Sequence, residues 1–361
     1  MNSKNISLLQ LVMIFMLSSG LLNHVTIIPI LLNIAGKDGW ISVCLAFACF
    51  LLWLPLLRHT IHKMNGVSFV TWVYSHLKGW AWVVLFPLLI VVYGIGATTL
   101  KETATWTQIT YLPNTPSFIV ILTLLFLCLT AANSGLKALA LTSGILLPFV
   151  VLFGFFVMSG NMPHKDYKLL RPILFNGFRP VLRGIIFAAS GLSELFLIVL
   201  LQHRISGKLN YRVLILLLLI LACLTIGPFM GSIAEFGTVE AAKQRYPAFE
   251  QWRLVQVSRF IEHLDFLSIY QWLAGAFVRI SLSLWLIADV LSKLMNVHKT
   301  NLLMISASAM CVFTLIPLSD SAFIYFLTTY CLPINVFVLI GVSIIVWILS
   351  WTIKKKVGAR V

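Results

Sequence analysis

Residues 8–32 read LLQLVMIFMLSSGLLNHVTIIPILL, and no Asp, Glu, Lys or Arg interrupts them. A helix that crosses a membrane needs ~20 mostly apolar residues, so this stretch is long enough. A small polar cluster, Ser18, Ser19 and Gly20, lies in its middle. Glycine lowers helix stability, and serine hydroxyls can bond nearby backbone groups instead of supporting the helix. The stretch therefore predicts a transmembrane helix that breaks in mid-membrane.

The rest of the chain is equally apolar. Of its 361 residues, 60% are hydrophobic and only 10% are charged, with a mean hydropathy of +0.98, whereas soluble domains carry about 25% charged residues. Continuous rather than alternating apolar runs favour helices over a β-barrel. The sequence therefore predicts an all-α integral membrane protein with about ten transmembrane helices. These are expected at residues 8–32, 40–57, 80–100, 117–132, 138–159, 181–202, 211–233, 266–291, 301–317 and 332–352.

Charge and cysteine content exclude several other classes. The net charge of +15 would favour nucleic acid in a soluble protein, but here we expect the bases in loops beside anionic lipid headgroups. The basic residues on the side of the termini lie in short, dense loops, which predicts cytoplasmic termini. The six cysteines form no Cys-x-x-Cys pair, so no disulfide, metal or cofactor is expected. The apolar run after Lys4 lacks a cleavage site and is expected to stay as the first span.

Two long outer loops organise the spans. Residues 160–180 are expected to link a first repeat, at about 7–159, to a second, at about 181–352, within one membrane domain covering residues 1–361. Five spans are an odd number, so the second half would enter the membrane from the opposite side, as in transporters with inverted repeats. In the other loop, residues 234–265, apolar residues spaced along the chain predict an amphipathic helix in the outer interface; an ordinary loop is the alternative. Those residues are Trp252, Val255, Phe260, Ile261 and Leu264.

The second half contains a counterpart to the small polar cluster of the first. Ser190 and Gly191 lie near the middle of span six. Transporters with inverted repeats break the first helix of each half and bind substrate at the breaks. We therefore expect helices one and six both to break and to offer free backbone groups to a ligand. Close helix packing through small residues is the alternative.

Two charged residues lie near the middle of expected spans, Glu194 in span six and Arg279 in span eight. Ionisable groups inside a membrane are costly and are functional candidates by default. Glu194 could bind a ligand amine, carry a coupling proton or pair with a cation. The alternative is a protonated structural carboxyl that is hydrogen-bonded to a neighbouring helix. We expect Glu194 and Arg279 to share a central cavity, paired or bridged by a ligand whose carboxylate would suit the guanidinium. Ser283 lies one turn after Arg279 on the same helix face.

Short motifs along nearly the whole chain are similar to those of one family. The matching positions are Leu17–Leu22 with Pro29 behind them, Asp38–Ser42, Leu170-Arg171-Pro172, Glu194, and Ile261-Glu262 followed by Trp272. Each motif is weak alone, and their order and spacing make the match specific. On these residues the chain resembles the B subunit of bacterial endospore nutrient-germinant receptors, a branch of the amino acid–polyamine–organocation transporter superfamily. The departures are a long stretch before Pro29 (His24, Val25, Thr26), Gly191 three rather than two residues before Glu194, and His263 in place of arginine.

The resemblance implies a five-plus-five inverted repeat in which spans one, three, six and eight surround a central pocket. It implies a small nutrient ligand such as an amino acid. It also implies two partners in the spore inner membrane, an A subunit with a large cytoplasmic domain and a lipoprotein C subunit on the outer face. Tyr93, Gly96 and Ala97 of span three resemble the pocket-lining segment of the family, with glycine packing as the alternative.

Two functions fit this fold, because function does not follow from fold. The first is a receptor subunit that binds a nutrient at the broken helices and signals germination. The alternative is a proton-coupled amino-acid transporter with Glu194 as the proton carrier. An enzyme is not expected, since no segment resembles a catalytic triad or a zinc-binding helix. A membrane scaffold would tolerate apolar residues at Glu194 and Arg279.

Overall fold

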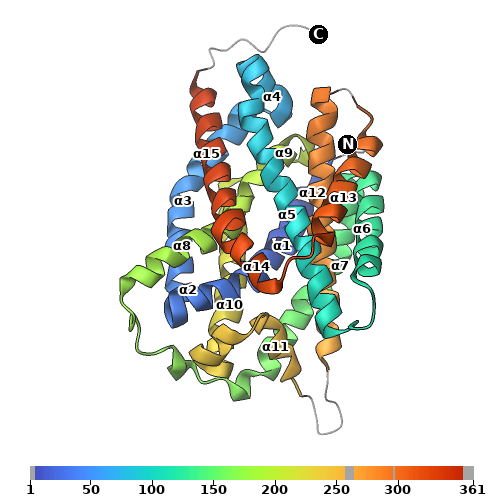
Figure 1. Cartoon of the computed structure of the whole chain (residues 1–361). Helices are drawn as coiled ribbons and strands as arrows, with labels where there is room; N and C mark the ends of the chain where they lie inside the picture. Colours follow the sequence, from blue (N-terminus) through green and yellow to red (C-terminus); the bar gives the residue numbers. More distant parts are fainter. Residues whose placement is uncertain (1–4, 257–263, 296, 353–361) are drawn as a thin grey trace.

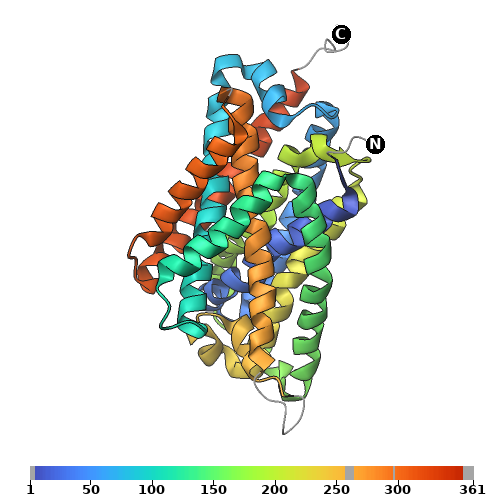
Figure 2. The ribbon, with the colours of Figure 1, turned by 90° about the vertical axis from the view of Figure 1, so that its right-hand side faces the viewer.

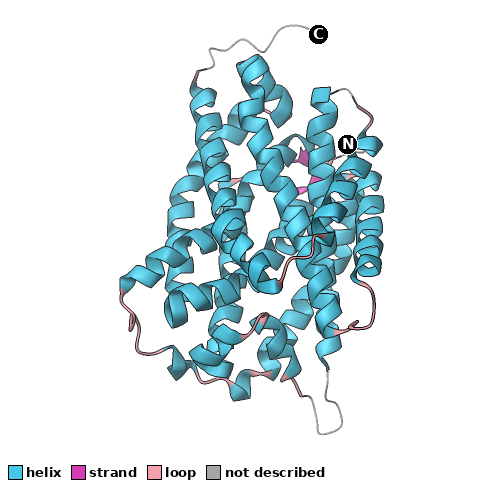
Figure 3. Cartoon of the chain, viewed as in Figure 1, coloured by secondary structure: helices cyan, strands magenta, loops and turns pink. Residues whose placement is uncertain are grey.

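The computed structural model describes residues 5–256, 264–295 and 297–352, and nearly all of them are helical (Figures 1 and 3). The α-helices are α1 (Leu8–Leu21), α2 (Ile27–Ala35), α3 (Gly39–Met64), α4 (Phe69–Leu77), α5 (Ala81–Thr110), α6 (Ser117–Ser134), α7 (Leu136–Gly160), α8 (Phe178–Ser193), α9 (Ile198–Leu201), α10 (Tyr211–Lys243), α11 (Pro247–Arg253), α12 (Leu267–Met295), α13 (Lys299–Leu315), α14 (Asp320–Phe326) and α15 (Leu332–Trp351). Short 3-10 turns connect several of them. Two-residue strands, β1 (Ile6–Ser7) and β2 (Ile205–Ser206), pair in parallel and are magenta in Figure 3.

Among the described residues, eight helical segments are long and apolar enough to cross a membrane, so the chain is a multi-pass membrane protein. The first, Leu8–Met64, is 57 residues long and contains both of the first two expected spans. Gly36, at φ +58°, turns the chain between α2 and α3, and glycine adopts such a backbone without strain. Lys299–Leu315, the ninth expected span, is apolar but only 17 residues long. A count of ten passes and the inverted repeat therefore stay predictions.

Helix one is irregular, but not where the sequence placed its break. Ser18, Ser19 and Gly20 are buried within the regular part of α1. The irregular part follows as a π-helical turn, Leu22–Thr26, which leads into α2. A π turn accommodates an extra residue in a helix, which accounts for the long stretch before Pro29. The predicted break at Ser18–Gly20 is therefore wrong, because these small residues belong to a helix that packs directly against Gly275 of α12 through Leu17 and Leu21.

Helix six also stays helical through its small residues. α8 runs past Ser190 and Gly191, and the chain then tightens into a 3-10 turn, Glu194–Leu197, before α9. Gly191 packs so closely on Asn23 of the π turn that a Cβ atom on it would collide with the Asn23 amide. Neither helix leaves helical backbone angles at these turns. The prediction of broken helices is thus corrected to two locally distorted helices that meet at Asn23 and Gly191.

Segment 234–265 differs from the amphipathic helix predicted there. α10 continues to Lys243 with a bend at Gly237, whose φ is +75°, and α11 has only seven residues. Trp252 and Val255 are buried against Val157 of α7 rather than presented to the interface. The part of the segment up to Val255 is therefore folded onto the protein. The residues Arg259, Phe260, Ile261, Glu262 and His263 lie outside the described part of the chain.

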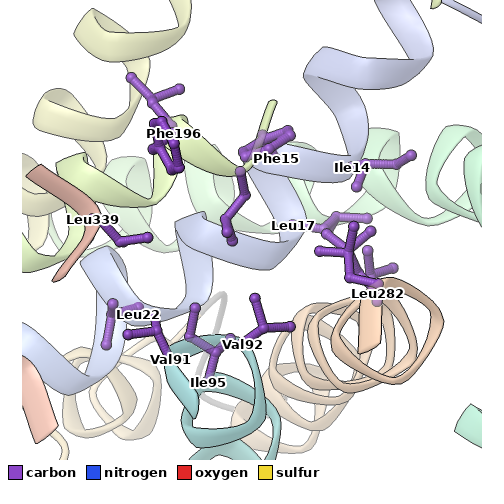
Figure 4. Packing of buried hydrophobic residues seen from close by; sticks show 14 of the residues in the cluster. Ile14, Phe15, Leu17, Leu22, Val91, Val92, Ile95, Phe196, Leu282 and Leu339 are labelled. Carbon is purple, nitrogen blue, oxygen red and sulfur yellow. The ribbon is translucent and has the colours of Figure 1, made fainter. Parts of the chain in front are cut away.

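The buried core includes much of α1, and α12 packs against several helices of the bundle. Figure 4 shows Phe15 and Leu17 of α1 among side chains of α5, α12, α15 and the 3-10 turn of helix six. α12 runs the length of the molecule beside α6 and α7 (Figure 2), and it also packs on α1, α5 and α13. The apolar windows of Phe178–Arg204 and Leu264–Met295 are each 89% buried, more than those of the other candidate spans. These two enclosed segments carry Glu194 and Arg279.

Lys101 shows why the end of span three was misplaced. The sequence put this lysine in an outer loop, but α5 continues to Thr110 and Lys101 is buried within it. Its Nζ donates to the carbonyl oxygens of Thr314 (2.9 Å) and Ile316 (2.6 Å). Thr314 lies in the last turn of α13 and Ile316 follows its end, where carbonyls lack partners within the helix. The Ile316 carbonyl also accepts from the Leu318 N–H at 2.8 Å. A lysine that caps a neighbouring helix can therefore lie beyond the reach of solvent.

Lys101→Met is expected to destabilise the protein by about 2 kcal/mol, because it leaves the carbonyl of the buried residue Thr314 without its side-chain donor and removes one of the two donors to Ile316. The measurement is thermal unfolding of the purified full chain in lipid nanodiscs. Lys243→Met is the matched control, since Lys243 is exposed and forms an ordinary ion pair with Glu240 at 3.5 Å. An equal effect of the two substitutions would contradict the capping role.

Candidate functional site

The centre of the molecule holds a buried ion pair between Arg279 of α12 and Glu194 of the 3-10 turn. Arg279 Nη1 lies 2.7 Å from Glu194 Oε2, and Nη2 lies 2.5 Å from Oε1. The two side chains are only 3% and 1% exposed. The sequence analysis predicted that these residues share a central site, and the structure shows a bidentate ion pair. Bidentate contacts are the strongest pairing of a guanidinium with a carboxylate.

Arg279 is also held by two further elements. Its Nε donates to Thr99 Oγ1 of α5 (2.9 Å), and its Nη1 donates to the carbonyl of Ser18 of α1 (3.0 Å). Burying an ion pair costs several kcal/mol per ion, which good geometry and additional hydrogen bonds offset. A guanidinium has five N–H groups, so these bonds leave one N–H of Nη2 without an acceptor among the described residues. Arg279 of α12 thus connects α5 and α1 to Glu194, and one of its N–H groups stays available to a ligand.

A small cavity lies beside Arg279. It measures about 20 Å³, which is about the room that one water molecule needs. No amino acid fits a space of this size, so the conformation described is closed. Its lining comes from helix one, α5, α12 and the last helix: Leu21, Leu22, Thr26, Thr98, Thr99, Glu102, Thr103, Trp272, Arg279, Leu327, Cys331, Leu332 and Asn335.

A second charged group lies on the cavity wall, one turn of α5 beyond Thr99. Glu102 is 6% exposed, and its Oε2 accepts a hydrogen bond from Thr26 Oγ1 of the π turn (2.7 Å). Arg245, which follows α10, places Nη2 3.3 Å from Glu102 Oε1 and Nε 3.1 Å from Asp320 Oδ2. Burial alone would lower the pKa of Arg245. The neighbouring Glu102, Tyr246 and Asp320 raise it by more, so the pKa lies above its ordinary value. Arg245 therefore stays charged between two carboxylates.

The small and polar residues expected to bind ligand mostly serve packing and local hydrogen bonds. In helix one, Ser18 offers its carbonyl to Arg279 and Ser19 offers its carbonyl to the Asn23 amide (2.8 Å). Gly20 packs near Leu224. In helix six, the hydroxyl of Ser190 is buried without a hydrogen-bond partner among the described residues. None of these residues lines the cavity.

The expected residues of spans three and eight are likewise turned to neighbouring helices. The Tyr93 hydroxyl donates to the carbonyl of Ala309 (2.8 Å), and Gly96 lies against Met310 and Ser283. Ala97 is buried in the core. Ser283 Oγ donates to the carbonyl of Arg279 (3.0 Å). The α5 residues at the cavity begin directly after Ala97 and are Thr98, Thr99, Glu102 and Thr103.

Sequence reasoning missed the other half of the site. Glu102 lies just past the expected end of span three, Arg245 was assigned to a loop, and Asp320 lies before the expected start of the last span. One signal was available: Thr99, Glu102 and Thr103 share a helix face by their spacing of three and four residues. A carboxylate with two threonines on one face of an apolar helix indicates a polar lining.

Comparison with known proteins places these features in one family. The family described as "Spore germination protein" matches residues 4–323. Spore germination protein XB of Bacillus anthracis is 41% identical over 97% of this chain and 99% of its own length. Spore germination protein KB of Bacillus subtilis is 24% identical over 70% of this chain and 69% of its own. Spore germination protein GerQB of Bacillus cereus is 22% identical over 70% of each.

Proposed function

Since the chain belongs to the spore germination protein family, we propose that it is the B subunit of a nutrient-germinant receptor in the spore inner membrane. It binds a small nutrient beside the Arg279–Glu194 pair and signals germination. The buried pair carries this proposal. A membrane scaffold has no need of it, because apolar residues often replace a buried ion pair without loss of stability, and ionisable groups at this depth are functional by default.

The closed cavity supports a receptor that changes conformation. A nutrient larger than water enters only if the helices around the roughly 20 Å³ space separate. A ligand shifts such an equilibrium by the difference between its affinities for the two states. Binding therefore favours an opened state, and partner subunits read that state. The A subunit and the lipoprotein C subunit are the partners proposed, with both termini of this chain on the cytoplasmic side.

A proton-coupled amino-acid transporter is the second candidate, because two buried carboxylates lie close to the cavity. Glu102 lines it, and Glu194 pairs with Arg279, which also lines it. Such groups carry protons in many transporters. In this alternative the same opening would alternate between the two faces of the membrane. The two functions differ in whether the nutrient crosses.

The test expresses the chain with its neighbouring genes in a spore-forming strain that lacks its own receptors. We expect spores that carry these genes to germinate with a mixture of the twenty amino acids, and spores that lack only this gene to fail. Uptake of the radiolabelled amino acids into membrane vesicles should be equal in the two strains. Lost uptake with normal germination would contradict the receptor and favour the transporter.

A further inference from the structure

Glu102 is a buried carboxylate with an incomplete set of partners. Its Oε2 is engaged by Thr26. Its Oε1 lies 3.3 Å from Arg245 Nη2, but the two groups lack hydrogen-bond alignment, and this oxygen is buried without a hydrogen-bond donor among the described residues. An unmade hydrogen bond to a buried charged group is costly. Oε1 is thus an acceptor at the cavity wall that a ligand donor would satisfy.

Arg245 has other partners besides Glu102, whereas Arg245 is the only cation within ion-pair distance of Glu102 among the described residues. Arg245 Nε makes two hydrogen bonds to Asp320, at 3.1 and 3.2 Å, and its guanidinium lies 4.6 Å from the centre of the Tyr246 ring. Its Nη2, the atom near Glu102, has no hydrogen-bond partner in the part of the chain that the structure describes. A competitor for Glu102 can therefore release Arg245 from the cavity wall while Asp320 still holds it.

The charges around the cavity favour a cation at this end. Arg279 and Glu194 neutralise each other, whereas Glu102 and Asp320 share the single charge of Arg245. These four residues leave one net negative charge on the side of Glu102, while the charge of the neighbouring Lys101 is engaged by the carbonyls at the end of α13. Like and unlike charges across a water-poor site interact far more strongly than in solvent. A positively charged ligand group is therefore stabilised there, and an anionic one is repelled.

We propose that Glu102 binds the ammonium group of the nutrient, which takes the place of Arg245 at Oε1. This deepens the proposed function and rests on it. Thr99, which holds Arg279, lies three residues before Glu102, about 4.5 Å along the helix. Glu102 and Arg279 also line the same cavity, so one small molecule in the opened cavity can contact both Glu102 and the spare Nη2 donor of Arg279. The ligand class that fits both groups is a zwitterion with neighbouring ammonium and carboxylate groups.

The test measures the amino-acid concentration for half-maximal germination in spores that carry the full receptor genes. Glu102→Gln keeps the shape of the side chain and removes its charge, so the required concentration should rise at least tenfold. Arg245→Gln removes the competitor, so the required concentration should fall. Glu250→Gln is the matched control, because the half-buried Glu250 pairs with the exposed Arg253 (3.1 Å) and lines no part of the cavity; it should leave the concentration unchanged. Immunoblots of spore membranes show whether each variant accumulates.

A second measurement on the unaltered protein needs no variant to fold. The N-acetyl derivative of the active amino acid keeps the carboxylate and loses the ammonium charge, and it should not trigger germination. Equal potency of the derivative, or a rise with both Glu102→Gln and Arg245→Gln, would overturn the ammonium site. A response to a sugar or nucleoside but to no amine would overturn it while the receptor function stands. No response to any of these nutrients would overturn the receptor function itself.

Discussion

Arg279→Met is expected to destabilise the protein by about 3–5 kcal/mol, the usual cost of removing one partner of a buried ion pair. The substitution leaves Glu194, which is 1% exposed, without a cation. It also removes the donors to Thr99 and to the carbonyl of Ser18, so α12 loses one polar contact with α5 and one with α1. The measurement is thermal unfolding of the purified full chain in nanodiscs. Arg253→Met, at an exposed ion pair, should change stability by less than about 0.5 kcal/mol.

The paired substitution separates stability from function. When Glu194→Met is added to Arg279→Met, no buried charge is left, and most of the lost stability should return. The nutrient response should stay absent, because the polar centre beside the cavity is gone. If the double variant were as unstable as Arg279→Met, the two residues would not be coupled. If it were stable and still responded to nutrient, the pair would be structural, and the central binding site would be contradicted.

The pairing of Glu194 and Arg279 was predictable because of the solvent. Apolar runs located the spans, and each buried charge then required a partner at a similar depth. The pairing could therefore be predicted from one quantity, the depth of each charged residue along its transmembrane helix. Small residues carry no comparable constraint, because a cluster such as Ser18, Ser19 and Gly20 is compatible both with a broken helix and with a tightly packed, unbroken one. The structure has the packed form, with Gly275 of α12 against α1.

The rest of the site was missed because hydropathy marks the apolar part of a helix and not its end. α5 continues ten residues beyond the predicted end of span three, from residue 100 to Thr110, and carries Lys101 and Glu102 into the protein interior. Each of these charges is compensated by a segment distant in sequence, the end of α13 for Lys101 and Arg245 for Glu102. Such partners depend on tertiary packing, which the spacing of residues along the chain does not reveal.

The contact between the two distorted helices leads to the second large prediction. Gly191→Ala would place a Cβ atom against the side chain of Asn23. Asn23 donates to the carbonyl of Ser19 and accepts from Thr225 Oγ1 (3.1 Å), so it cannot move without weakening both bonds. Overpacking costs about 1–3 kcal/mol, and weakening two buried hydrogen bonds adds about 1 kcal/mol each. We expect a loss of about 3 kcal/mol in thermal unfolding.

Gly20→Ala is the matched comparison, because it makes the same change at the other small polar cluster. A Cβ atom on Gly20 would meet only the flexible end of Leu224, at 3.2 Å. Alanine favours a helix over glycine by about 1 kcal/mol, so this substitution should be neutral or stabilising. If Gly20→Ala were the more damaging of the two, helix one would need to unwind at Gly20, as the sequence first suggested. The order of the two effects therefore decides whether the flexible point of helix one is Gly20 or the π turn that begins at Leu22.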